Sequence, residues 1–275
     1  MIGTGYLIVL VLTGLLVGTL SGMLGVGGGF LMVPIQLWLY SSTGLPEDLA
    51  LRLALGTSLA VIIPTAASGA IGHHRKGAVV WRAGFLLGVS GAFGAVAGGL
   101  LATHLPAEPV EIFFGLIVLA AGIRTIATRG SERWDVPKIP DRRYLIWGVP
   151  VGVVSGLAGI GGGVLLIPVL TSVFRFEMHR AVATSTVVMI CAATGGVLTY
   201  LIGGLGIPGL PEWTIGYIDP LQAFIIAATS IPAAQAGSVI AHRIPSRVLR
   251  IGFLLLTGYI GLRMIGVFSW AGITP

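Results

Sequence analysis

Two glycine triplets have the residue types and spacing best suited to binding chemistry. They are Gly27, Gly28 and Gly29 near the start of the chain, and Gly161, Gly162 and Gly163 in its second half. Consecutive glycines leave their backbone N–H groups unobstructed, and each triplet precedes an apolar run that predicts a helix. N–H groups at the start of a helix attract anions, because the helix dipole places partial positive charge there. The triplets therefore predict anion-binding sites built from backbone.

Polar side chains inside apolar runs form a second group of candidates. They are Gln36, Thr57, Ser58, Thr184, Ser185 and Gln235. Hydroxyl groups can bind sulfonyl or carboxylate oxygens without the cost of a buried charge, and the glutamines can line a pathway. Each of the six can equally join two helices, just as close helix packing explains most of the 43 glycines. The sequence leaves both uses open.

Several other kinds of site are excluded. Neither triplet is followed by Gly-Lys-Ser/Thr or gives Gly-x-Gly-x-x-Gly after a strand, so a nucleotide-binding loop is excluded. The lone Cys191 excludes a disulfide framework and a cysteine metal cluster. No nucleophile, base and orienting residue recur at an interpretable spacing, so we expect no enzyme activity and no cofactor.

Acidic and histidine side chains stand at the ends of the apolar runs. No Asp or Glu falls in the middle of a run, which argues against a buried carboxylate proton relay and against a metal-cation transporter. His73 and His74 precede Arg75 and Lys76, so we expect a solvated pair. If transport is coupled to protons, the proton would be carried by the substrate itself, because no carboxylate is expected in the core.

The composition shows what kind of protein carries these residues. The chain has 275 residues, of which 55% are hydrophobic and 9% charged, where soluble proteins have roughly a quarter charged. So little charge cannot cover a water-facing surface, and the chain is predicted to be an all-α polytopic membrane protein in a lipid bilayer. The basic residues that give the net charge of +6 lie in short loops, as the positive-inside rule explains, so no nucleic-acid partner is implied.

Apolar runs predict ten helical segments. They lie near residues 5–20, 30–41, 52–72, 79–102, 109–128, 144–157, 164–174, 181–203, 219–241 and 247–268. The first, second, sixth and seventh are too short to cross a bilayer comfortably. These four form two pairs, each broken by a glycine triplet, so a pair can be a re-entrant hairpin or two crossings.

The two halves of the chain repeat each other. Residues 21–34, Ser-Gly-Met-Leu-Gly-Val-Gly-Gly-Gly-Phe-Leu-Met-Val-Pro, align without gaps against residues 155–168, Ser-Gly-Leu-Ala-Gly-Ile-Gly-Gly-Gly-Val-Leu-Leu-Ile-Pro, with eight of fourteen positions identical. Further on, Thr57-Ser58 aligns with Thr184-Ser185. We therefore expect a first transmembrane repeat at 1–128, a cytoplasmic linker at 129–143 and a second repeat at 144–275.

Basic residues predict the orientation of the repeats. When the loops are numbered in order, the odd-numbered side carries 14 of the 16 Lys and Arg residues. The positive-inside rule makes that side cytoplasmic and both termini periplasmic or extracellular. Five segments per repeat is an odd number, so the second repeat is inverted. Inverted repeats with glycine-broken short segments at matching positions point to a transporter site near the midplane.

The doubled motif also supports a family resemblance. Gly25-Val-Gly27-Gly28-Gly29 with Pro34, repeated as Gly159-Ile-Gly161-Gly162-Gly163 with Pro168, resembles the sulfite exporter TauE/SafE (TSUP) family of membrane permeases over nearly the whole chain. The resemblance implies a secondary transporter of sulfite, sulfoacetate or related organosulfonates in the bacterial cytoplasmic membrane. This substrate class agrees with the independent argument from the triplets.

The sequence therefore predicts a secondary anion transporter that works by alternating access and serves as an exporter. An uncoupled anion channel or facilitator is the first alternative, and a metal-cation transporter is less favoured. The apolar exterior is compatible with lipid alone or with a homodimer. The exact substrate, the direction of transport and the coupling ion are not fixed by the sequence.

Overall fold

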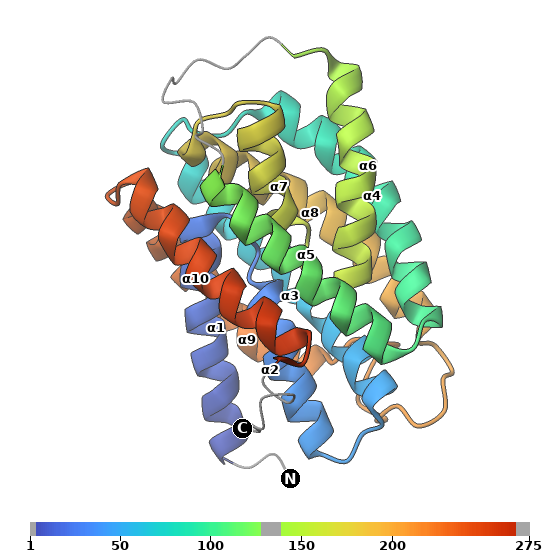
Figure 1. Ribbon diagram of the computed structural model, residues 1–275. Coiled ribbons are helices and arrows are strands. Elements are labelled where there is room, and N and C mark those ends of the chain that lie inside the picture. Colours follow the sequence, from blue (N-terminus) through green and yellow to red (C-terminus); the bar gives the residue numbers. More distant parts are fainter. Residues whose placement is uncertain (1–3, 128–138, 268–275) are drawn as a thin grey trace.

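The computed structural model describes residues 4–127 and 139–267, and these ranges form a helical bundle (Figure 1). The helices are α1 (Thr4–Leu24), α2 (Gly29–Ser42), α3 (Glu47–His74), α4 (Trp81–His104), α5 (Ala107–Ala127), α6 (Asp141–Ala158), α7 (Gly163–Pro168), α8 (Met178–Gly203), α9 (Pro220–Ala241) and α10 (Ser246–Met264), with a π-helical turn (Val169–Val173) after α7. The described residues contain no β-strand, which confirms the expected all-α class.

Five of these helices are long and apolar enough to cross a membrane. They are α1, α3, α4, α8 and α9. Large apolar side chains on their outer faces are exposed, for example Phe93 on α4 and Phe224 on α9, at 74% and 71%. A bilayer makes such faces stable where water would not. The chain is therefore a multi-pass membrane protein.

Two of the segments expected to be too short to cross are longer than the sequence indicated. The first segment was expected to end at residue 20 and to be too short to cross, but α1 continues to Leu24 and is 21 residues long. The sixth segment was expected at 144–157 and forms α6, which begins at Asp141 and ends at Ala158. In α1 the Ser21-Gly22 pair stays helical, because Gly22 packs closely against α9. The added residues of α6 lie mainly at its start, before Tyr144.

The short helices after the two triplets differ from each other. Proline lacks an N–H and interferes with the preceding turn. Pro34 nevertheless lies inside α2, which stays helical to Ser42. Its counterpart Pro168 ends α7, and the chain continues in the π-helical turn. The predicted seventh segment, 164–174, is therefore two elements.

Glycine faces bring helices from opposite halves together. A Cβ added to Gly18 of α1 would collide with the backbone of Ser230 on α9, and one added to Gly152 of α6 would collide with Gly91 on α4. Figure 1 shows α4 beside α6, and α1 lies against α9 in the same way. Each half thus contributes one helix to each close pair, so the halves are interleaved.

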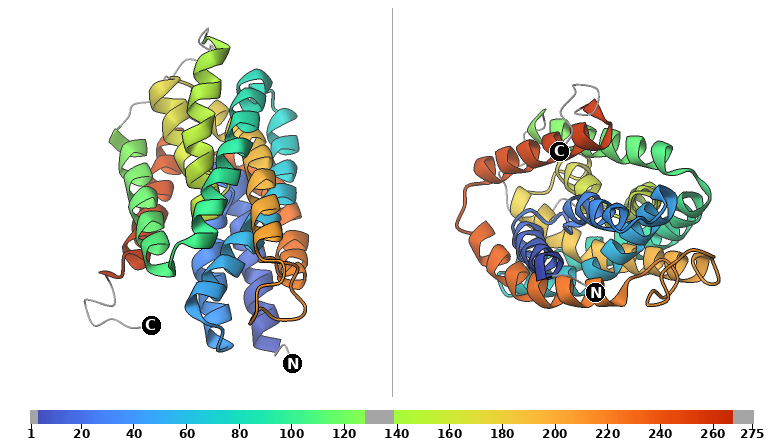
Figure 2. Two further views of the ribbon diagram at one scale, coloured as in Figure 1. Left: turned by 90° about the vertical axis from the view of Figure 1, so that its right-hand side faces the viewer. Right: turned by 90° about the horizontal axis from the view of Figure 1, so that it is seen from below.

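The centre of the bundle is formed by α3 and α8, which contact each other and are the most buried of the five membrane-spanning helices. Helices α5 and α10 pack together along one side (Figure 2). These pairings are compatible with two inverted copies, but the inversion and the repeat boundaries stay predictions. The linker at 129–143 lies mostly outside the described residues.

Candidate functional site

Both glycine triplets lie where a helix ends inside the bundle. Between α1 and α2, the φ angles of Gly27 and Gly28 are 80° and 74°. Between α6 and α7, those of Gly161 and Gly162 are 70° and 80°. Residues with a Cβ rarely adopt this left-handed conformation, so glycine is needed there. All six triplet residues are buried, as a site at membrane depth requires.

The two breaks pack directly against each other. A Cβ added to Gly29 would lie 2.7 Å from the carbonyl oxygen of Gly159, and one added to Gly163 would lie 2.7 Å from that of Gly25. The backbones of the two breaks therefore meet with no room for side chains. Ile62 of α3 and Met189 of α8, which are equivalent in the alignment that pairs Thr57 with Thr184, cover this crossing.

The two serines hold the crossing together. Ser58 Oγ lies 2.6 Å from the carbonyl oxygen of Gly159, and Ser185 Oγ lies 2.7 Å from that of Gly25. Each hydroxyl can donate its proton to a carbonyl of the opposite half. In this conformation the serines therefore join the two halves, which is the helix-bonding use that the sequence left open.

The two threonines accept hydrogen bonds from the opposite half. The N–H of Asp219 donates to Thr57 Oγ1 at 2.9 Å, and the N–H of Val80 donates to Thr184 Oγ1 at 3.1 Å. Asp219 and Val80 immediately precede α9 and α4. The sequence expected both threonines a few residues into their helices. Thr57 lies deeper, because α3 begins at Glu47 and not near residue 52.

The two candidate glutamines are placed differently. Gln36 is fully buried, and its Nε2 lies 3.4 Å from Oε1 of Gln222. Among the described residues, Gln36 Oε1 has no hydrogen-bond partner. Gln235 is exposed on α9, because the inward face of that helix is formed by small residues such as Ala234 and Gly237. The structure brings Gln36 toward the centre and leaves Gln235 outside.

A cavity of about 310 Å³ opens beside Gln222, toward the end of the bundle where α1 begins. It is lined by Tyr6, Leu10, Tyr40, Thr43, Leu45, Pro211, Trp213, Asp219, Leu221 and Gln222. The Asp219 carboxylate accepts from the Gln222 N–H at 3.0 Å and lies 3.4 Å from the hydroxyl of Tyr40. Gln222 Nε2 also donates to the hydroxyl of Tyr6. We call this cavity the outer pocket.

Asp219 and Glu177 are both buried. It stands at the end of its segment, as the sequence indicated, but only 3% of it is exposed. Glu177, which precedes α8, is 7% exposed. The sequence did not indicate that these two carboxylates are buried; it argued only against a buried carboxylate proton relay, which stays a prediction. Both residues are N-caps, and the helix starts that they cap lie within the bundle.

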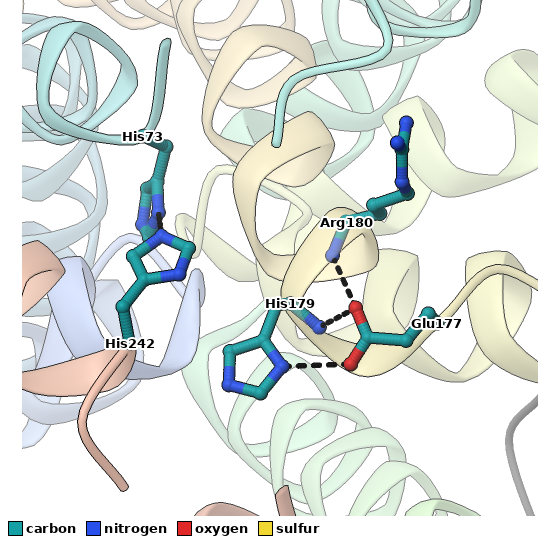
Figure 3. Close-up of polar contacts among 5 residues, drawn as sticks. All are labelled: His73, Glu177, His179, Arg180 and His242. Carbon is teal, nitrogen blue, oxygen red and sulfur yellow. Dashed lines mark hydrogen bonds and ion pairs between the residues drawn. The ribbon is translucent and has the colours of Figure 1, made fainter. Parts of the chain in front are cut away.

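A cluster of three histidines and Glu177 lies at the opposite end of the bundle (Figure 3). His73 Nδ1 lies 3.2 Å from His242 Nε2, and His73 Nε2 lies 2.9 Å from the carbonyl oxygen of Gly22. The His242 ring stacks on His179 at 5.5 Å between centroids. His179 Nδ1 is 2.7 Å from Glu177 Oε1. We call these four side chains the histidine cluster.

His73 corrects an expectation. It was predicted to lie on a solvated surface with His74, but only 1% of it is exposed. It is part of α3, which ends at His74, and its ring turns inward against α1 and α9. His74 is exposed as expected. Within the described residues, no three His, Cys, Asp or Glu side chains are arranged to hold a metal ion.

A second cluster lies toward the outer pocket. Tyr200, which aligns with His73, donates its hydroxyl proton to the carbonyl of Gly156 at 3.0 Å. Its ring meets that of Tyr217 edge-on at 6.5 Å. Arg52 donates to the Tyr217 hydroxyl at 3.3 Å. Because Gly156 aligns with Gly22, the two clusters make equivalent hydrogen bonds in the two halves. We call Tyr200, Tyr217 and Arg52 the tyrosine cluster.

The chain is similar to known membrane transporter proteins over most of its length. The family model described as "Sulfite exporter TauE/SafE" matches residues 10–264. A probable membrane transporter protein of Methanocaldococcus jannaschii is 30% identical over 93% of this chain and 94% of its own length. One of Haemophilus influenzae is 28% identical over 94% and 98%, and one of Bacillus subtilis is 24% identical over 95% and 99%. No solved structure matches the chain.

Proposed function

The chain belongs to the sulfite exporter TauE/SafE family and is a membrane transporter, and we propose that it is a secondary transporter of small sulfur-containing anions. Sulfite, sulfoacetate and related organosulfonates are the substrate class. The membrane is the bacterial cytoplasmic membrane, and the direction is export.

The observation that carries the proposal is the crossing of the two glycine breaks. Two helix starts, each formed by glycines without side chains, lie buried against each other inside the bundle. Backbone that leaves helical geometry at this depth is tolerated where it is buried in protein or lines a pathway. A small anion can be bound by N–H groups there without any buried cation. The six triplet glycines are therefore the proposed substrate ligands.

The hydroxyl groups suggest how such a site works by alternating access. In the observed conformation Ser58 and Ser185 bind carbonyls of the opposite half, so the crossing is closed. If the halves rock apart, these serines and the adjacent threonines lose those partners and can bind the oxygens of the anion. Gln36, whose Oε1 has no partner among the described residues and whose Nε2 faces Gln222 of the outer pocket, is the proposed pathway residue.

Charge at the two mouths supports export. The acidic residues Glu47, Asp48 and Asp219 lie toward the outer pocket, whereas Arg75, Lys76, Arg175, Arg180 and Arg243 lie toward the histidine cluster. By the positive-inside rule the histidine cluster is cytoplasmic, with both termini outside. A basic mouth raises the local concentration of anions, and an acidic mouth repels them. Anions are therefore collected inside and disfavoured from re-entering outside.

Flux measurements in proteoliposomes test this proposal. Labelled sulfite and sulfoacetate should show saturable flux that an imposed pH gradient drives. Flux that saturates but ignores both pH and sodium gradients would identify an uncoupled facilitator. The absence of flux for both anions would refute the substrate class while leaving the membership of the family intact.

Variants at the crossing connect that flux to the glycines. Gly28→Val and Gly162→Val should each abolish flux, because valine does not adopt the left-handed conformation and would fill the N–H cradle. Gly258→Val on α10 is the matched control, since nothing lies within 4 Å of a Cβ added there. The amount of inserted protein must be equal in all three. Normal flux by both crossing variants would refute the proposed site.

A further inference from the structure

The histidine cluster connects four helices at the basic end of the bundle. His73 is at the end of α3, His242 directly follows α9, and Glu177 and His179 are at the start of α8. The carbonyl that His73 contacts belongs to Gly22, three residues before the first glycine break. The cluster is therefore linked to the end of α1, just before that break.

Hydrogen-bond chemistry fixes where the protons are in the observed contact. A carbonyl oxygen only accepts, so His73 Nε2 carries a hydrogen that it donates to Gly22. In a neutral His73, Nδ1 is then a lone pair that accepts from His242 Nε2–H. The contact between the two rings thus contains one hydrogen. A proton added to His242 leaves its Nε2–H in place, so its effect on the cluster comes from the added charge and not from the loss of this hydrogen bond.

One positive charge in the cluster is balanced. His179 faces Glu177 Oε1 through Nδ1, and the backbone carbonyls of Ala241 and Ile244 also hydrogen-bond to it. An imidazolium can donate from both nitrogens, so acceptors on both sides suit a charged His179. Glu177 is the counter-charge and also accepts from the backbone N–H groups of His179 and Arg180.

A second positive charge has no such partner. The titratable and charged groups facing His242 are His73 and Lys76 at the end of α3, and His179 and Glu177 at the start of α8. From α1, the group in contact is the uncharged Gly22 carbonyl. Glu177 already pairs with His179, so a proton on His242 adds a cation among cations. A buried charge without a partner is costly and moves toward water.

The electrostatics of the two loop residues agree with this account. Burial, followed by the nearby His179 and Lys76, lowers the pKa of His242 below its usual value. Burial would raise the pKa of Glu177, but its hydrogen bonds with His179 outweigh burial and the pKa is lowered. At neutral pH the cluster therefore holds an ionised Glu177 and a neutral His242. Protonation of His242 is expected only below its usual value of about 6.5.

We propose that the histidine cluster is a proton-binding site that controls the inner end of the transport pathway. With one balanced proton it ties α1, α3, α8 and α9 together, and a further proton on His242, which His179 and Lys76 repel, drives the end of α9 toward water. This inference rests on the proposed function only in naming that end the inner mouth of the pathway. Acid on that side then opens the mouth.

Thiol labelling measures the opening without requiring transport. Ser238 lies on α9 one turn before His242, is 1% exposed, and is close to Gly22 and Gly72. Ser238→Cys in a Cys191→Ser background places one small thiol directly behind the cluster. A membrane-impermeant maleimide, added from the side of the cluster, reports how open this end is. The same cysteine is labelled in parallel in the His242→Gln variant. The ratio of the two labelling rates then cancels the intrinsic pH dependence of the thiol.

The expected result is a pH-dependent ratio. Gln at 242 can still donate to His73 Nδ1 but does not titrate, so this end should stay closed at every pH. As pH falls from about 8 to about 5, the labelling rate with His242 present should therefore rise relative to the rate with His242→Gln. The rise should be up to about tenfold per pH unit below the ordinary histidine pKa of about 6.5, at which a freed His242 takes up its proton. A ratio that stays flat over this range would overturn the proposal.

His74→Gln is the matched control, because His74 adjoins the cluster in sequence but its ring contacts Trp81 on the surface. The rise in labelling should survive His74→Gln. If His74→Gln removes the rise as completely as His242→Gln does, the cluster is not the proton-binding site.

Flux of sulfoacetate separates this inference from the proposed function. Its sulfonate and carboxylate both stay ionised at pH 5.5 to 8, so the charge of the substrate is constant to a good approximation. If flux rises when the side of the cluster is acidified, and this rise is lost in His242→Gln, the proposed function and the proton-binding site are both supported. A labelling switch without flux of any anion would refute the proposed function alone. Flux without a labelling switch would refute the proton-binding site alone.

Discussion

The two ends of the bundle make the same hydrogen bond with different side chains. At one end His73 donates to the carbonyl of Gly22, and at the other end Tyr200 donates to the carbonyl of Gly156. Both donors come from the centre of the bundle, since α3 and α8 contain them. Around His73 the neighbours are imidazoles and a carboxylate, whereas around Tyr200 they are Tyr217 and Arg52.

The difference teaches that equivalent positions need not share a pH response. Imidazole changes charge between pH 5 and 8, whereas phenol and guanidinium do not. The end with histidines can therefore respond to the pH of its own compartment, while the end with tyrosines keeps its hydrogen bond at any physiological pH. Variants at matched positions in the two halves test this difference.

The largest difference is expected between the two glycine breaks. Gly28→Ala and Gly162→Ala both impose a left-handed conformation on alanine, at roughly 1–2 kcal/mol each. At Gly28 the new Cβ would also collide with Val17, which adds about 1–3 kcal/mol. At Gly162 its closest neighbours are Ser155 Cβ and Val151 Cγ1, both at 3.3 Å. Gly28→Ala should therefore cost more free energy of unfolding, measured by denaturant titration in detergent.

Gly258→Ala is the control for that pair, since a Cβ there meets nothing within 4 Å. It lies inside α10, where alanine is the better helix former, so its stability should rise slightly or stay the same. Equal losses of unfolding free energy in Gly28→Ala and Gly162→Ala would show that Val17 can move aside without cost. The break in the first half would then not be the tighter one.

The next effect compares the two donors directly. Tyr200→Phe removes a buried hydroxyl and leaves the Gly156 carbonyl unpaired, at about 1–3 kcal/mol at every pH from 5 to 8. His73→Leu should cost a similar amount at pH 8. The pKa of its partner His242 is lowered by folding, so this contact contributes fully above about pH 6.5 and is lost as pH falls. The loss on His73→Leu should therefore shrink in acid.

Unfolding titrations of both variants at pH 8 and pH 5 check this. The wild type at each pH is the reference, so general acid effects cancel. If the cost of Tyr200→Phe shrinks in acid as much as that of His73→Leu, the pH response does not come from the histidines. The contrast between the two ends would then have no functional meaning.

A smaller effect is expected at the crossing. Ser58→Ala and Ser185→Ala each remove one hydrogen bond to a carbonyl of the opposite half, at about 1 kcal/mol. Because the two bonds are equivalent, the losses should agree within about 0.5 kcal/mol. The double variant measures their coupling. Losses that differ by more than about 1 kcal/mol would show that the crossing is not equivalent on its two sides.

The sequence predicted the parts of this site that depend on repetition. The two triplets aligned without gaps, so their placement at two helix breaks could be expected from residues 21–34 and 155–168 alone. The membrane-spanning helices could also be predicted, because long apolar runs are stable mainly as helices in a bilayer. The end of α1 was missed, since a Ser-Gly pair looks like a stop until a neighbouring helix is known, whereas for α6 the start was missed.

The residues that the sequence misplaced owe their position to tertiary packing. His73 stands in a run of basic residues, which indicates water, and its burial depends on α1 and α9. Asp219 stands before a proline at a helix start, where an N-cap could be predicted but not its depth. One signal for His73 was present: it aligns with Tyr200, which lies in an apolar run. Gln235 had no such signal, because the outward face of α9 is set by its neighbours.

The smallest effect concerns two ion pairs of equal length. Arg82 and Asp141 are 2.7 Å apart, as are His179 and Glu177. The side chains of the first pair are 76% and 43% exposed, and those of the second are 17% and 9% exposed. Water and salt screen the exposed pair, so Asp141→Asn should change the free energy of unfolding by less than about 0.5 kcal/mol.

Glu177→Gln should cost more than Asp141→Asn, because Glu177 also caps α8 through the N–H groups of His179 and Arg180. Its pKa is lowered in the folded protein, so its contribution is present above the unfolded value of about 4.3 and is lost as pH falls further. Unfolding titrations at pH 7 and pH 3.5 should therefore show a difference between the two variants that narrows in acid. A difference that is the same at both pH values would mean that the cap, and not the charge, accounts for the role of Glu177, and that the histidine cluster lacks the counter-charge on which its proton binding depends.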